Sequence, residues 1–284
     1  MTKIYGHRGA KGTYPENTLL SFKKAIEHGV DGLELDVHLT KDGEVVVIHD
    51  ETLDRTTNRS GWIKDLTLAE IREASAGSVF NHFEKYEESW DKEKVPTLQE
   101  VLELISSYDI ELNIELKTYV IPYNGIEEKV LQLVEQYASD KKIIYSSFHL
   151  PTLLRIKEIH SDAKIAWLLK EGISLPEDHL RTLGLEALHL HKHILIPNKN
   201  LFQQINHLMN HPQIDLPKEV TQYIREKLNE NYQNHWQNLY EKIRVWTVND
   251  LNEIVQLLDL NVEAIITDFP ERAIALRSER EYLA

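Results

Sequence analysis

Residues 32–38 read Gly-Leu-Glu-Leu-Asp-Val-His and, after the glycine, alternate strictly between apolar and polar side chains. Successive residues of a β-strand point to opposite faces, so this alternation predicts a strand with three apolar residues on one face and Glu34, Asp36 and His38 on the other. Residues 112–117, Leu-Asn-Ile-Glu-Leu-Lys, repeat the pattern. Each strand therefore has an apolar face that suits packing against helices and a charged face that points inward if the sheet closes into a barrel.

Eight β-rich segments alternate with amphipathic helical segments along the 284 residues. Residues 127–137, 153–159 and 251–258 carry apolar side chains at helical spacing, which predicts crossover helices packed on one face. Eight strands and a length near the roughly 250 residues of a (β/α)8 TIM barrel favour that α/β fold over a doubly wound open sheet. The predicted strands are 4–7, 32–37, 111–117, 143–147, 164–169, 187–190, 244–248 and 264–267.

Two stretches are longer than a plain crossover needs. One insertion, residues 51–96, follows the second strand, and a helical insertion, residues 197–242, lies between strands six and seven. Loops that follow strands build the active-site face of a barrel, so both are expected to wall a pocket within one domain spanning residues 1–284. Four residues in the second insertion form a helical stripe, which packs on the barrel wall in the preferred interpretation or makes a homodimer or partner contact. The stripe is Leu228, Tyr232, Trp236 and Tyr240.

Composition excludes several classes of protein. Hydrophobic residues make up 42% of the chain, which is too many for a disordered protein, and the net charge of −14 argues against a nucleic acid partner. The chain has no cysteine, so disulfides, thiolate metal sites and thiol nucleophiles are excluded and any metal must be held by Asp, Glu or His. No secretory segment or run of about 20 apolar residues is visible, so we expect a cytoplasmic protein without integral membrane association.

The inward faces of the two alternating strands bring Glu34, Asp36 and Glu115 together. Burying carboxylates without a partner is costly, so a cation is expected among them. In a purely structural alternative, Arg8 and Lys117 form ion pairs and the remaining carboxylates lie at the barrel rim. Three carboxylates against two cations favour one oxygen-ligated divalent ion, Mg²⁺ or Ca²⁺.

The chain has fourteen histidines, and their positions relative to the predicted strands identify the catalytic candidates. His7 ends the first strand between glycines, where a ligand can approach closely. The Asp-Gly pair at 42–43 predicts a two-residue hairpin turn, whose register would set His49 directly opposite Asp36; a three-residue loop would shift that register. His7 and His49 are therefore the candidate acid–base pair. His38, higher on the same face as Glu34 and Asp36, is not a preferred catalytic candidate. His189, His191 and His193 could line the mouth, but packing, capping or solvent exposure is their preferred role.

Arg8 and Lys117 are suited to hold a phosphate, the first through a planar pair of donors and the second as a point charge. Three carboxylates, one divalent ion and these two side chains sum to about one positive charge. A phosphodiester monoanion would cancel that charge, whereas a phosphomonoester dianion matches it less well.

With these residues the sequence resembles the glycerophosphodiester phosphodiesterase family, in motifs that follow one another in family order along nearly the whole chain. The motifs are His7-Arg8-Gly9, Pro15-Glu16-Asn17-Thr18, Glu34-Leu35-Asp36-Val37, Leu39-Thr40-Lys41-Asp42-Gly43, Val46-Val47-Ile48-His49-Asp50, Glu115-Leu116-Lys117, Ser146-Ser147-Phe148, Trp246-Thr247-Val248-Asn249 and Ile266-Thr267-Asp268-Phe269-Pro270. The resemblance implies a (β/α)8 barrel, a divalent ion, and hydrolysis of glycerophosphodiesters such as glycerophosphocholine or glycerophosphoethanolamine to glycerol 3-phosphate and an alcohol.

The resemblance also implies roles for single residues, matched by position. It makes Glu34, Asp36 and Glu115 the metal ligands and His7 and His49 the acid–base pair. Arg8 and Lys117 become the phosphate ligands. Phe148 and Trp246 line the glycerol or leaving-group side, with packing as the alternative for these two. The stretch 197–242 departs from the family pattern, in which a shorter crossover is expected. The length of this stretch is therefore expected to affect how open the pocket is and which head groups fit.

Three other functions remain to be weighed against this one. A lysophospholipase D-type activity keeps the chemistry but needs an apolar trough. A non-catalytic phosphodiester-binding protein would use the same clamp, yet has no need of both His7 and His49. A structural barrel with ion pairs would tolerate Glu34→Gln without loss of a ligand or a rate.

Overall fold

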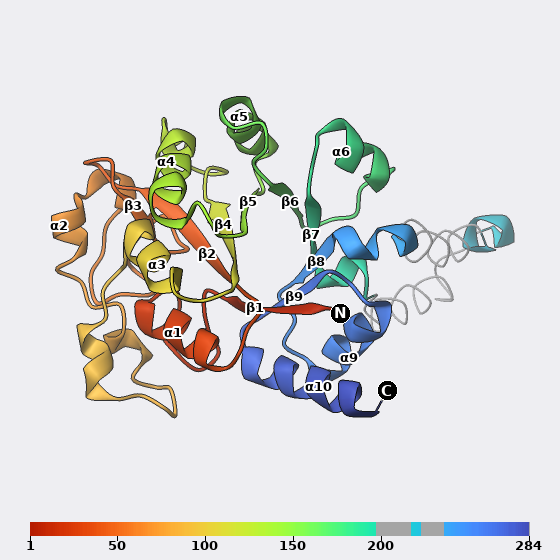
Figure 1. Cartoon of the computed structure of the whole chain (residues 1–284), viewed down its shortest axis with the longest axis horizontal. Helices are drawn as coiled ribbons and strands as arrows, with labels where there is room; N and C mark the ends of the chain where they lie inside the picture. The colour runs from red at the N-terminus through yellow and green to blue at the C-terminus, as the bar shows by residue number, and fades with distance from the viewer. Residues whose placement is uncertain (197–216, 223–235, 284) are drawn as a thin grey trace.

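Eight parallel strands pair edge to edge and close into a barrel, because β1 pairs with both β2 and β9 (Figure 1). The computed structural model describes residues 1–196, 217–222 and 236–283. A short strand, β3, adds to β2 in the antiparallel direction outside the closed ring. The strands are β1 (Lys3–His7), β2 (Gly32–Leu39), β3 (Val45–Val47), β4 (Glu111–Leu116), β5 (Ile143–Ser147), β6 (Ile165–Leu169), β7 (Ala187–His191), β8 (Ile243–Trp246) and β9 (Ala264–Thr267).

The TIM barrel expected from the sequence is confirmed, and the doubly wound open sheet is excluded by the closing β1–β2 pairing. Each of the eight predicted strand segments coincides with a barrel strand, and the three predicted crossover helices coincide with α4, α5 and α9. Helices lie outside the ring of strands (Figure 1). They are α1 (Leu19–Glu27), α2 (Leu68–Ile71), α3 (Leu98–Ile105), α4 (Ile126–Ala138), α5 (Leu150–Ile159), α6 (Pro176–Thr182), α9 (Leu251–Leu260) and α10 (Pro270–Leu283).

The β2–β3 hairpin corrects one prediction. Val37 pairs with Val47, and the amide of Ile48 donates to the Asp36 carbonyl at 3.1 Å, so Ile48 and not His49 lies opposite Asp36. The loop has three residues, 41–43, and Gly43 at φ +80° occupies its left-handed position. An extra loop residue shifts the pairing by one position, which is why the two-residue turn predicted the wrong partner.

The first insertion has a small hydrophobic core of its own that also includes residues of β3 and its extension. It contains α2 and three short 3-10 helices, η1 (Ile63–Asp65), η2 (Ser78–Phe80) and η3 (Glu88–Lys92). Sharing this core anchors the insertion to the strand end that precedes His49. The core consists of Val46, Ile48, Leu53, Ile63, Ile71, Ala74, Ala76 and Val95.

Of the second insertion, residues 217–222 and 236–242 are described, so Leu228 and Tyr232 of the predicted stripe lie outside the described residues. Trp236 is buried and Tyr240 packs against the main core, as the barrel-wall interpretation expects for these two. Among the described helices, none is long and apolar enough to cross a membrane.

A buried ionic network closes the amino-terminal end of the barrel. Arg244, which is almost fully buried, donates to the Tyr5 hydroxyl and to Glu263, each at 2.8 Å. Glu111 accepts from Tyr5 and, at 2.8 Å, from Lys3. Because this end of the barrel is filled, the charged residues at the carboxyl ends of the strands are the ones open to a ligand.

Candidate active site

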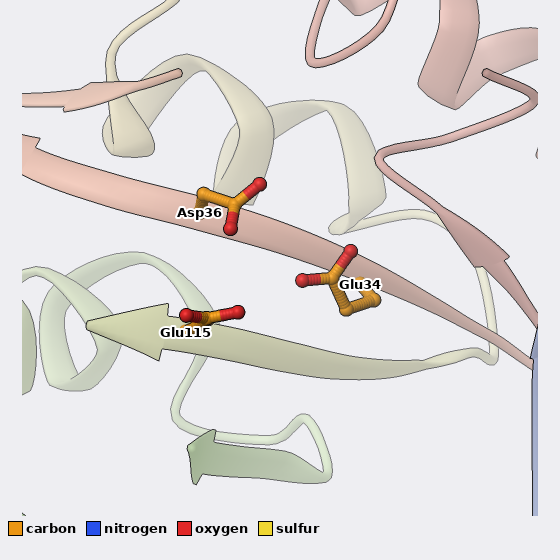
Figure 2. A group of neighbouring side chains, drawn as sticks. All are labelled: Glu34, Asp36 and Glu115. Atoms are coloured by element: carbon orange, nitrogen blue, oxygen red, sulfur yellow. The ribbon is translucent and has the colours of Figure 1, made fainter. Parts of the chain in front are cut away.

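The three predicted metal ligands converge inside the barrel mouth. Glu34 and Asp36 project from β2 and Glu115 projects from the neighbouring β4, where it pairs in register with Asp36 (Figure 2). One carboxylate oxygen of each residue lies within 4.8 Å of the others, and all three side chains are buried. The cluster could therefore hold a metal ion, as three carboxylates suit a hard divalent cation.

The electrostatics of the cluster also fit a bound cation. Burial, together with the charges of Asp36 and Glu115, raises the pKa of Glu34 well above its usual range, and burial raises the pKa of Glu115. Although burial opposes it, the neighbouring Arg8 and Lys117 lower the pKa of Asp36. Within the described part of the chain, Asp36 Oδ1 accepts no hydrogen bond. A divalent ion would satisfy this oxygen and favour the ionised form of Glu34.

Arg8 reaches the cluster through a strained turn after β1. Its backbone lies in the left-handed region at φ +50°, which is costly for a residue with a side chain, and Gly9 follows at φ +84°. The turn directs the Arg8 amide to Glu34 Oε2 at 3.0 Å and places the guanidinium Nε 3.2 Å from Asp36 Oδ2. The other end of the guanidinium donates from Nη1 to Glu16 Oε1 at 2.8 Å.

Lys117 lies on the opposite side of the same carboxylates, just beyond the end of β4. Its Nζ donates to Glu115 Oε1 at 3.0 Å and lies 3.6 Å from Asp36 Oδ1. Despite burial, the charges of Glu115 and Asp36 raise the pKa of Lys117, so it stays protonated. Arg8 and Lys117 thus flank Asp36 as two fixed positive charges.

His7 faces the cluster with a defined tautomer. Its Nδ1 lies 2.6 Å from Asp268 Oδ1, and since a carboxylate only accepts, Nδ1 carries the proton. The remaining nitrogen, Nε2, lies 3.9 Å from Glu34 Oε2. Burial and the charge of Arg8 lower the pKa of His7 to about 4, and Asn249 orients Asp268 by donating to it at 2.8 Å. His7 is therefore neutral near pH 7.

His49 is oriented in the same way by a second carboxylate, that of Asp50. Its Nδ1 lies 2.6 Å from Asp50 Oδ1, and its Nε2 accepts from Lys117 Nζ at 3.2 Å. The His49 carbonyl accepts from His38 Nε2 at 3.0 Å, and the other nitrogen of His38 lies 2.9 Å from the Tyr123 hydroxyl. The imidazole reaches Lys117 beside the cluster even though its strand register differs from the prediction, and His38 supports the His49 backbone.

Aromatic residues meet at the carboxyl ends of β5, β7 and β8. The rings of Phe148 and Trp246, which follow or end β5 and β8, meet edge to face at 5.5 Å. His191 contacts the same tryptophan at 5.0 Å and lies next to His193. His189 is buried inside the barrel. The predicted lining residues therefore touch each other across strands that are not neighbours.

Sequence reasoning assigned no role to four charged residues of this site. Asp268 and Asp50 hold the two histidines, and Glu16 is bound by Arg8 and Arg55. A signal existed for two of them, because Asp268 directly follows a barrel strand and Asp50 adjoins His49. Arg55 lies in the insertion, and nothing in its local sequence pointed to the site.

Carboxylates, two imidazoles and two cations gather at the carboxyl ends of the strands, the end of the barrel where TIM-barrel enzymes carry their active sites. The sequence model of the glycerophosphoryl diester phosphodiesterase family matches residues 7–272. This chain therefore belongs to that family and is a phosphoric diester hydrolase.

Individual relatives agree over almost the full length. The chain is 38% identical over 280 residues to a glycerophosphodiester phosphodiesterase of Bacillus altitudinis, covering 98% of this chain and 99% of the relative. It is 37% identical over 275 residues to one of Caldanaerobacter subterraneus subsp. tengcongensis, covering 97% of each. Among solved structures, an Oleispira antarctica phosphodiesterase in complex with the product sn-glycerol-3-phosphate superposes with a TM-score of 0.73 at 26% identity, covering 98% of this chain and 97% of that one.

Proposed function

We propose that this enzyme hydrolyses glycerophosphodiesters, such as glycerophosphocholine and glycerophosphoethanolamine, to glycerol 3-phosphate and an alcohol in a metal-dependent reaction. The observation that carries the proposal is the convergence of three buried carboxylates with two oriented imidazoles and two fixed cations. The glycerol 3-phosphate in the Oleispira antarctica neighbour supports this substrate class.

Glu34, Asp36 and Glu115 would hold one divalent ion, Mg²⁺ or Ca²⁺. Their oxygen-only donor set is the one that hard cations prefer. Burial and the charges of Asp36 and Glu115 raise the pKa of Glu34, and a bound cation would offset both effects. When bound, the ion would stabilise negative charge on the phosphoryl oxygens.

Arg8 and Lys117 would bind the phosphate, and His7 and His49 would move the protons. Both histidines keep a proton on Nδ1, so each exchanges protons with the reacting oxygens through Nε2. The nucleophile, either a neighbouring glycerol hydroxyl that forms a cyclic ester or a water molecule, loses a proton to one imidazole. The leaving alkoxide gains a proton from Nε2 of the other imidazole, which must carry a proton on both nitrogens when this step begins, and each transfer is worth about 10² to 10⁴ in rate.

Phe148 and Trp246 would line the side of the pocket that receives the leaving alcohol or the glycerol. Their edge-to-face contact holds the two rings together as an apolar surface at the carboxyl ends of β5 and β8. Such a surface would shield the reacting phosphate from bulk water and strengthen the electrostatic interactions around it.

The test is coupled detection of glycerol 3-phosphate released from glycerophosphocholine and glycerophosphoethanolamine, with and without a chelator. We expect chelator-sensitive release that Glu34→Gln abolishes, since that variant loses a ligand charge. Glu158→Gln, on the outer surface of α5, is the matched control and should keep full activity. Undiminished turnover by Glu34→Gln would refute the metal assignment, and binding of both diesters without any release of product would refute the hydrolase proposal.

A further inference from the structure

Arg55, in the first insertion, lies between two carboxylates, one of which binds Arg8 and the other His49. Its guanidinium donates to Glu16 from Nη1 at 2.9 Å and from Nη2 at 2.8 Å. The same group donates to Asp50 from Nε at 2.7 Å and from Nη2 at 3.0 Å. Four hydrogen bonds from one guanidinium, paired two by two, form a geometrically specific contact that a surface ion pair rarely achieves.

Each carboxylate held by Arg55 in turn holds a residue of the site. Glu16 Oε1 also accepts from Arg8, and Asp50 Oδ1 also accepts from His49 Nδ1. The result is a continuous chain of charged hydrogen bonds, which we call the Arg55 bridge: Arg8, Glu16, Arg55, Asp50 and His49. It joins the proposed phosphate ligand to one of the two proposed proton-transfer residues.

We propose that Arg55 is a positioning residue of the hydrolase, which acts through Asp50 on His49 and through Glu16 on Arg8. The inference rests on the proposed function for its kinetic consequence, and the geometry that it invokes can be tested apart from activity. It also gives the first insertion a role in assembling the site, in addition to walling it.

Burial explains why a second arginine is required. The Glu16 side chain is only 3% exposed, so its charge must be compensated by protein groups. Without Arg55, the Arg8 guanidinium is its sole described cationic partner and would be drawn away from Asp36. With Arg55 present, Glu16 is shared, and Arg8 keeps its Nε 3.2 Å from Asp36 Oδ2.

The effect on His49 follows from the freedom of Asp50. The Asp50 side chain is 26% exposed and lies outside the strands, so its hydrogen bonds to His49 and Arg55 are what the structure shows holding it in place. Arg55 occupies both of its oxygens and leaves Oδ1 aimed at His49 Nδ1. A carboxylate in this position selects the imidazole tautomer that presents Nε2 to the reactants.

The experiment compares Arg55→Gln and Arg55→Lys with Arg59→Gln, an exposed residue of the same insertion whose ion pair with Glu73 lies in solvent. We expect Arg55→Gln to lower kcat about 10- to 100-fold, the range found for groups that orient a catalytic ligand, with a smaller change in KM. Arg55→Lys should recover part of the loss, and Arg59→Gln should match the wild type. Equal kcat values for Arg55→Gln and Arg59→Gln would overturn the proposal.

Two further measurements separate positioning from simple stabilisation. Imidazole ¹⁵N NMR spectra should show His49 losing its single tautomer in Arg55→Gln but not in Arg59→Gln, and this readout holds whatever the substrate is. In a double-mutant cycle, Arg55→Gln should lower kcat much less in the Asp50→Asn background than it does in the wild type. An unchanged His49 spectrum, or additive losses of kcat, would overturn the inference; absence of glycerol 3-phosphate release by the wild type would count against the proposed function alone.

Discussion

At this site, hydrogen-bond partners fix the tautomer and the ring orientation of each candidate catalytic histidine. His7 and His49 each donate from Nδ1 to a carboxylate at 2.6 Å, which leaves Nε2 facing Glu34 in His7 and Lys117 in His49. The two carboxylates differ in their own support, since Asp268 is held by Asn249 and Asp50 by Arg55. Tautomer and ring orientation are therefore decided before a substrate arrives, which lowers the entropy cost of reaching the reactive geometry.

Replacing Asp268 by Asn tests this arrangement for His7. We expect kcat to fall at least about 100-fold with little change in KM, because an amide can favour the wrong imidazole tautomer while keeping the shape of the site. Steady-state kinetics with glycerophosphocholine measures the effect. Asp162→Asn, on the exposed loop after α5, is the control, and a kcat for Asp268→Asn equal to that of this control would contradict the role.

Removing the imidazole of His49 should separate binding from chemistry. We expect His49→Ala to cut turnover at least about 100-fold while titration calorimetry still detects diester binding, because Arg8 and Lys117 remain in place. His160→Ala, an exposed residue after α5, should behave as the wild type. Turnover within a fewfold of normal would remove His49 from the mechanism.

Among the elements, β2 organises the site and its partner strands complete it. β2 supplies Glu34 and Asp36 from one face, and its next inward residue, His38, supports the chain that returns from β3. The His49 carbonyl can only accept, so His38 carries its proton on Nε2 and its Nδ1 accepts from the Tyr123 hydroxyl. His38 thus links β2, the β3 extension and the loop after β4 in its neutral form.

Stability should therefore depend on pH through His38. Burial lowers the pKa of His38 from about 6.5 to about 4, so on acidification the unfolded chain takes up a proton before the folded protein does. The free energy of unfolding is then full above pH 6.5 and falls towards pH 4, by up to about 3 kcal/mol from this residue. Urea unfolding at pH 7 and pH 5 should show a smaller difference for His38→Asn than for the wild type; an equal difference would contradict the assignment.

At the scale of the whole molecule, the two ends of the barrel differ in whether their buried charges are balanced by protein groups. The carboxyl ends of the strands gather an excess of negative charge that suits a cation, whereas the amino ends pair theirs internally through Arg244, Glu263 and Glu111. The first end is arranged to bind a ligand, and the second closes the barrel around a compensated network. Function and stability are therefore separated along the barrel axis.

Arg244 tests this separation. Arg244→Met leaves Glu263 and Glu111 without their buried cation, so the free energy of unfolding should fall by about 3 kcal/mol or more, as measured by urea denaturation. Arg244→Met combined with Glu263→Gln should recover part of the loss. The kcat of the folded enzyme should stay near that of the wild type, and a loss of kcat without a loss of stability would show that the ends are coupled.

Much of the fold could be predicted from the sequence because the patterns that indicate it involve residues close together in the chain. Period-two alternation identified the inward faces of β2 and β4, and the count of β-rich segments identified the barrel. Hairpin geometry was harder to read, because Gly43 can end a two-residue or a three-residue loop, and one residue of difference moved His49 from its predicted partner.

The amino-acid sequence by itself determined the barrel, the carboxylate faces and the residue types that end each strand, since these depend on neighbours a few positions apart. Only the closed structure decided which distant groups meet. His7 and Asp268 are separated by 261 positions, and Arg55 reaches Glu16 from an insertion with its own core. Such contacts form because barrel closure and the packing of that core bring these segments together, and no local pattern encodes the distance between them.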